Sequence, residues 1–231
     1  FILMNMEGKE ITVPNESDLS AVDQWIISKM NTLTKDVTEN MDKFELGIAV
    51  QKVYDFIWDE FCDWYIELAK YRIYHAEENP AAANSALYTL KTVLGDALKL
   101  LHPFMPFVTE EIYGALVPEE ESLMMSSWPE YKESSCYPEA ENIVDHMKEI
   151  IRGVRNVRAE MNVAPSRKAK TYIVCENENL CQGFEEIKES SMPLMSANEI
   201  QIQSDKSGIA EDAVSVVVAD AVVYLDRKST R

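Results

Sequence analysis

Apolar residues recur at helical spacing over long stretches of this chain, and prolines rather than glycines interrupt them. Three long stripes run from about Asp18 to Leu101 and a short one follows, with breaks before Pro80, at Pro103 and before Pro118. Only seven glycines occur in 231 residues. Because short connections place long amphipathic helices antiparallel to their neighbours, this pattern predicts an antiparallel helix bundle.

The pattern changes in the last third of the chain. One more amphipathic helix is predicted between Pro138 and Pro165, and we assign it to the same bundle. Beyond Pro165, short runs of β-branched residues surround one helix, which predicts a small mixed α/β segment. We therefore expect a mainly α fold with four parts: a connection at 1–17, a helical bundle at 18–164, an α/β segment at 165–225 and a tail at 226–231.

Composition excludes several classes of protein. With 40 acidic against 22 basic residues, the net charge of −18 argues against indiscriminate binding to nucleic acid or to anionic membranes. No apolar run approaches the ~20 residues of a membrane-spanning helix, so we expect a cytoplasmic protein that does not contact a membrane. The cysteines and histidines lack metal-ligand spacing, and no phosphate-binding glycine motif or nucleophile elbow occurs. We predict no catalytic residue, metal site or cofactor in this chain.

The second long helix carries more apolar surface than one core-facing stripe requires. Beside its main stripe, Trp58, Cys62, Ile66 and Ala69 follow one another at i, i+4, i+8 and i+11. Two interpretations are open. Other helices of the bundle cover both faces, or the row borders a groove in which unstacked bases lie against apolar atoms.

Basic residues gather in one window of this acidic chain. Residues 148–170 contain seven basic and two acidic side chains. Arg152, Arg155 and Arg158 are three residues apart, and we expect them to climb one side of a helix. The window either contacts nucleic-acid phosphates or is a solvated face whose arginines pair with carboxylates of the same chain.

Four sequence strings identify a family. These are DQWIIS at 23–28, FCDWYIE at 61–67, LHPFMPFVTEE at 101–111 and RNVRAEMNV at 155–163. They occur in this order in valyl-tRNA synthetases, which are class I aminoacyl-tRNA synthetases, and the chain resembles that family over nearly its whole length. The resemblance implies the C-terminal part of the enzyme with its anticodon-binding domain. The ATP-binding signatures of the family do not occur here, so its catalytic and editing domains are expected upstream.

The resemblance also implies site residues and partners. Phe1 matches an aromatic residue that borders the anticodon groove, and Cys62, Ile66 and Glu67 match the facing side. We add Trp58 and Lys70 to this groove. The set expected to hold the tRNA backbone is Arg152, Arg155, Arg158, Arg167 and Lys168.

We expect a monomer that binds the tRNA for valine and adjoins the upstream catalytic domain of the same chain. The complete enzyme would use ATP with Mg²⁺, and no residue here would contact either. The alternative function is a helical protein–protein interaction module, in which the second apolar face binds a partner helix.

Overall fold

The computed structural model describes residues 1–211, 213–218 and 220–226. Contacts divide the chain into two compact units, Phe1–Pro138 and Glu139–Arg231. The helix predicted after Pro138 therefore groups with the C-terminal strands, whereas the sequence assigns it to the bundle. The domain bounds 18–164 and 165–225 stay a prediction. Of the predicted tail, residues 227–231 lie outside the described residues.

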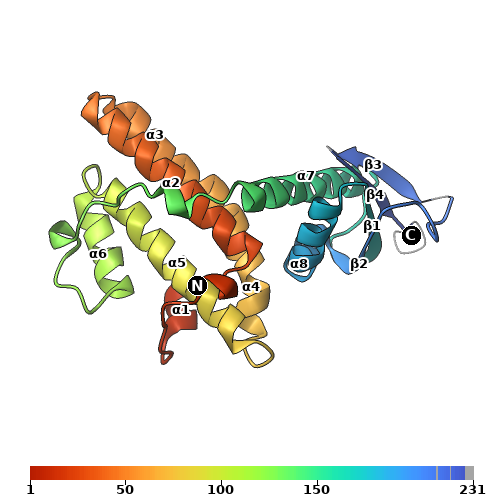
Figure 1. The fold of residues 1–231 in the computed structure, drawn as a ribbon, viewed down its shortest axis with the longest axis horizontal. Helices are drawn as coiled ribbons and strands as arrows, with labels where there is room; N and C mark the ends of the chain where they lie inside the picture. The colour runs from red at the N-terminus through yellow and green to blue at the C-terminus, as the bar shows by residue number, and fades with distance from the viewer. Residues whose placement is uncertain (212, 219, 227–231) are drawn as a thin grey trace. The chain divides into compact units, whose positions relative to one another are not determined.

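The first unit is a helix bundle, as the sequence predicts. It contains α1 (Ile2–Met6), α2 (Ala21–Asp42), α3 (Leu46–Asp55), η2 (Phe56–Tyr65), α4 (Ile66–Tyr74), α5 (Pro80–Leu101) and α6 (Pro106–Leu116). Short 3₁₀ turns lie at η1 (Glu16–Asp18), η3 (Leu123–Met125) and η4 (Glu133–Ser135). Helix α2 packs against α3 and α5, and α5 also packs against α4 and α6 (Figure 1). The apolar stripes form the core, where Trp25, Ile26 and Leu90 are completely buried.

A buried ionic network joins four elements of this bundle, α2, η2, α4 and α5. The Asp23 carboxylate, on the first turn of α2, is fully buried and accepts two hydrogen bonds from the Arg72 guanidinium of α4. The Tyr65 hydroxyl donates to it at 2.7 Å and the Ser85 hydroxyl at 2.8 Å. Asp23 also accepts from the backbone N–H of Ser20, which closes a capping box at the start of α2. The network fixes α2, α4 and α5 relative to one another.

The segment between α3 and α4 is a π-helix. Residues Phe56–Tyr65 continue the axis of both neighbours without a break in helical structure. Bonds from residue i to i+5 widen a helix, and such segments are frequent at functional sites. The widened segment contains Trp58 and Cys62, two residues of the surplus apolar row.

The second unit is a four-stranded mixed sheet with two helices. Its elements are α7 (Pro138–Glu160), β1 (Ala169–Cys175), α8 (Glu178–Met195), β2 (Ala197–Gln203), β3 (Val214–Val218) and β4 (Ala221–Leu225). The strand order is β2-β1-β4-β3, with β1 and β2 parallel and the other two pairings antiparallel. These elements confirm the predicted mixed α/β segment.

Two glycines mark where α7 approaches its neighbours closely. A Cβ atom built at Gly153 of α7 would lie 2.9 Å from a methyl group of Val218 on β3. One built at Gly183 of α8 would lie 2.5 Å from Ile143 of α7. Helix α7 thus lies close to β3 at Gly153 and close to α8 at Ile143. None of the helices in the described ranges is both long enough and apolar enough to cross a bilayer.

Candidate functional site

The predicted groove residues lie along one side of α3, η2 and α4. Trp58 is 53% exposed, Cys62 and Ile66 are partly exposed, and only Ala69, the last of the row, is fully buried. The row is therefore open over most of its length. The interpretation in which other helices cover both apolar faces is wrong for these three side chains, while their role in an anticodon groove stays a prediction.

Phe1, Glu67 and Lys70 come together beside this row. The Lys70 ammonium lies 5.6 Å from the centre of the Phe1 ring and forms an ion pair of 2.5 Å with Glu67. Both side chains of the pair keep about a third of their surface exposed. An ammonium over an aromatic face is attracted by the ring quadrupole. Lys70 is thus held by two partners, and its side chain is 33% exposed.

Two tyrosines that sequence reasoning did not single out extend the row. Tyr74 is 65% exposed and meets Phe1 edge to face, with ring centres 6.4 Å apart. Tyr54 is 56% exposed, and its ring centre lies 6.2 Å from that of Trp58. Sequence spacing offered the signal, because Tyr54 and Tyr74 continue the four-residue steps of Trp58, Cys62, Ile66 and Lys70 in both directions. We call these residues, with Phe1 and Glu67, the α3–α4 face.

Cys62 presents a neutral surface on this face. Burial, and then the adjacent Asp63 carboxylate, raise the pKa of the Cys62 thiol above its usual 9.0. The thiol therefore stays protonated at neutral pH and behaves as a small apolar group with a weak donor. Among the described residues, no group of three His, Cys, Asp or Glu side chains is placed to hold a metal ion.

The five basic residues predicted to bind the tRNA backbone are not all exposed. Arg152, Arg155, Arg167 and Lys168 are exposed in the second unit, but Arg158 is only 5% exposed. Three-residue steps rotate backwards by about 60° each around a helix. Two steps beyond Arg152, the position of Arg158 falls on the buried side, four residues after Val154. The expectation that the three arginines climb one side of the helix is wrong for Arg158.

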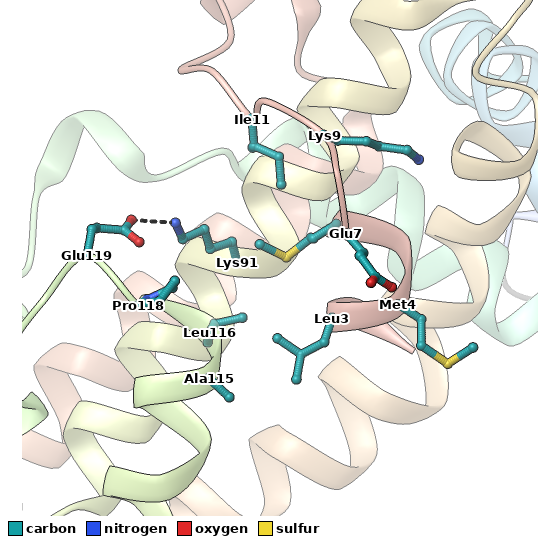
Figure 2. Close-up of a pocket in the computed structure, with 11 residues that line it drawn as sticks. Leu3, Met4, Glu7, Lys9, Ile11, Lys91, Ala115, Leu116, Pro118 and Glu119 are labelled. Carbon is teal, nitrogen blue, oxygen red and sulfur yellow. Dashed lines mark hydrogen bonds and ion pairs between the residues drawn. The ribbon is translucent and has the colours of Figure 1, made fainter.

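A cavity elsewhere in the first unit contains none of the predicted site residues. It has a volume of about 530 Å³ and lies between α1, α5 and α6 (Figure 2). Leu3 and Met4 of α1 and Leu116 of α6 contribute to its mainly apolar lining. Lys91 and Glu119, which also line it, form an ion pair of 2.7 Å. Seven of its eleven lining residues are apolar, so its lining favours apolar contacts.

Comparison with known proteins gives consistent matches. Residues 23–173 match the family model described as the anticodon-binding domain of tRNA ligase. The chain is 42% identical over 229 residues to the valine–tRNA ligase of Clostridium tetani and 44% identical over 228 residues to that of Clostridium acetobutylicum. It is 36% identical over 228 residues to that of Carboxydothermus hydrogenoformans. These alignments cover 97–99% of this chain and 25% of each relative, so the chain spans about a quarter of their length.

Proposed function

The chain belongs to the family of anticodon-binding domains of tRNA ligases, and we propose that it recognises the anticodon of the tRNA for valine through its α3–α4 face. The observation that carries this proposal is the cluster of Phe1, Lys70 and Tyr74 beside an open apolar row. The family match and the valine–tRNA ligase relatives support the choice of ligand.

Single-stranded RNA is recognised through bases that leave their stack. Such bases lie against aromatic or apolar side chains, and polar groups form hydrogen bonds with their edges. In this proposal, Trp58, Cys62 and Ile66 provide the apolar surface, and Phe1 provides an aromatic one. Glu67 accepts and Lys70 donates hydrogen bonds at base edges. Because each holds the other in place, less side-chain entropy is lost on binding than for two free chains.

Phosphate contacts would position the RNA without selecting it. We assign them to the exposed members of the basic window, Arg152, Arg155, Arg167 and Lys168. These contacts are independent of sequence and weaken as salt rises, because bound cations are released from the RNA. Selection among tRNAs then depends on the α3–α4 face.

We also propose the wider setting of this activity. The complete protein attaches valine to its tRNA and uses ATP with Mg²⁺, while this chain supplies no catalytic residue. It works in the cytoplasm as a monomer, with its catalytic domain upstream in the same polypeptide. The names of the valine–tRNA ligase relatives support the proposed activity of the complete protein, and the quarter of their length that this chain spans supports a longer polypeptide.

The test is a pair of dissociation constants measured by fluorescence anisotropy at one salt concentration. The 231-residue chain is titrated into labelled tRNA for valine and into the same tRNA with a substituted anticodon. We expect tighter binding to the valine anticodon by about ten-fold or more, since one good base contact contributes about 1–3 kcal/mol in the analogous case of DNA. Equal dissociation constants, or no binding of either RNA, would refute the proposal.

A salt series on the same samples separates RNA binding from the protein-interaction alternative. The logarithm of the association constant for tRNA should fall steeply and linearly with the logarithm of salt concentration. A contact between an apolar face and a partner helix carries no such counterion release. Binding that is insensitive to salt would favour the protein-interaction module.

A further inference from the structure

A second cavity, in the C-terminal unit, is lined by two arginines. It has a volume of about 480 Å³ and lies between the end of α7, the loop that follows and the end of α8. Arg155, Arg158 and Ser196 line it, and its remaining lining residues are apolar. No acidic side chain is among the described residues that surround it. The cavity thus combines two cations with a mainly apolar wall.

Arg158 is a buried cation with an unsatisfied donor. It is 5% exposed, and its Nη2 donates to the backbone carbonyls of Ala164 and Arg167, which hold the loop after α7. Its Nη1 is buried and has no hydrogen-bond partner among the described residues. Burial lowers the pKa of Arg158, yet a guanidinium in a protein remains protonated at neutral pH. A buried charge without a counter-charge is costly, so an anion close to the Arg158 guanidinium would stabilise this arrangement.

The local charges leave the cavity positive. The C-terminal ends of α7 and α8 each contribute about half a negative charge from their free carbonyls. The two guanidinium groups carry two positive charges, so the net charge around the cavity is about one positive charge. The Nε of Arg155 donates a hydrogen bond of 2.8 Å to the backbone carbonyl of Leu194, near the end of α8. Its charge offsets the α8 end, and the charge of Arg158 remains to attract an anion.

We propose that this cavity binds a phosphoryl oxyanion, which the positive charges of Arg158 and Arg155 in its lining attract and hold. A phosphate offers several strong acceptor oxygens, and charge-assisted hydrogen bonds to arginine are among the strongest in proteins. The source we infer is a backbone phosphodiester of the bound tRNA, and this assignment rests on the proposed function. Free phosphate shares the same chemistry, and the experiment distinguishes the two.

The first arm measures inorganic phosphate alone. The chain is titrated with phosphate by calorimetry, with sodium chloride at equal ionic strength as the blank. We compare the unchanged chain with Arg158→Met and with Ser196→Asp, which places a carboxylate in the cavity and leaves the loop contacts of Arg158 in place. Ser196 has a φ of 53°, a conformation that aspartate tolerates. Lys206→Met is the control, because it changes the charge of the same unit equally at an exposed site outside the cavity.

The oxyanion site predicts saturable binding of phosphate that weakens by about ten-fold or more in Ser196→Asp and Arg158→Met and is unchanged in Lys206→Met. If Arg158→Met does not fold, Ser196→Asp alone decides this arm. The proposal is overturned if phosphate acts no differently from chloride, or if Ser196→Asp binds phosphate as well as the unchanged chain does.

The second arm identifies the source of the phosphate with tRNA. A backbone phosphodiester predicts that Ser196→Asp weakens binding of cognate and anticodon-substituted tRNA equally, and more than Lys206→Met does. Unchanged tRNA affinity in Ser196→Asp, with the phosphate site lost, would overturn the RNA source and leave a site for free phosphate. Failure of the anticodon proposal has a different signature: equal affinities for the two tRNAs in the unchanged chain.

Discussion

Removing Arg72 should destabilise the helix bundle more than removal of any surface ion-pair partner. Its side chain is 10% exposed and that of Asp23 is fully buried, so Arg72→Met leaves a carboxylate in the core without its counter-charge. Breaking a buried pair in this way costs about 3–5 kcal/mol of unfolding free energy. The hydrogen bonds from Tyr65 and Ser85 remain and place the expected loss at the lower end of that range.

The pH dependence of this loss follows from the pKa of Asp23. Burial raises that pKa, but the charge and hydrogen bonds of Arg72, with the hydroxyl groups of Tyr65 and Ser85, outweigh burial and hold it below 3.8. A lowered pKa in the folded state stabilises the protein above pH 3.8, and the stabilisation is lost as pH falls through the folded value. Without Arg72, burial dominates and raises the pKa, so protonation relieves the buried charge. The deficit of Arg72→Met should be largest near neutral pH and narrow towards acid pH.

Tryptophan fluorescence is the appropriate assay because Trp25, Trp58, Trp64 and Trp128 all lie in the first unit. Urea unfolding of Arg72→Met is followed by this signal at several pH values. It should show the lower unfolding free energy of the variant at neutral pH and a smaller difference from the unchanged chain at acid pH. Lys52→Met is the matched control. Its ion pair with Asp36 is 39% exposed on both sides and should contribute less than about 1 kcal/mol. Equal small losses in both variants, or a deficit that is constant with pH, would refute the reasoning.

Three further predictions concern other parts of the molecule. Arg167→Ala together with Lys168→Ala should weaken binding of cognate and substituted tRNA equally and lower the salt slope by up to about 2, as a salt titration would show. Gly183→Ala should destabilise the second unit by about 1–3 kcal/mol because its methyl group would collide with Ile143, and faster hydrogen exchange in the β1 and β2 strands would report it. Alkylation of Cys62 should be slow at neutral pH and rise only above pH 9.0, because the pKa of its thiol is raised. Bound tRNA should slow that alkylation further, as measured by mass spectrometry.

Sequence patterns predicted the helices and strands closely because apolar periodicity reports which face of an element is buried. The β-branched runs expected after Pro165 form strands, among them Val214–Val218 and Ala221–Leu225. The same patterns do not identify what covers a buried face. Helix α7 has a clear apolar stripe, but the spacing of that stripe does not show that α7 approaches β3 at Gly153 and α8 at Ile143. The π-helix at 56–65 was also beyond prediction, since its residue types suit an α-helix equally well.

The candidate site was predicted in part. The row at Trp58, Cys62 and Ile66 is open, which is one of the two interpretations that its surplus apolar spacing allowed. Phe44 lies before α3 with a φ of 59° and is 86% exposed, a backbone turn that apolar spacing does not indicate. The buried position of Arg158 and its unsatisfied Nη1 depend on how the loop after α7 folds back. Local spacing does not contain that information.

The central claim is that the α3–α4 face distinguishes anticodons, and one variant tests it most directly. Glu67→Gln removes the charge that holds Lys70 and weakens an acceptor for a base edge, with little change in shape. Asp59→Asn is the control, with the same change of charge at an exposed site on η2, which precedes α4, and outside the row. The measurement is the ratio of dissociation constants for cognate and anticodon-substituted tRNA at one fixed salt concentration. We predict that this ratio narrows in Glu67→Gln and stays unchanged in Asp59→Asn, whereas an unchanged ratio in Glu67→Gln would contradict the claim.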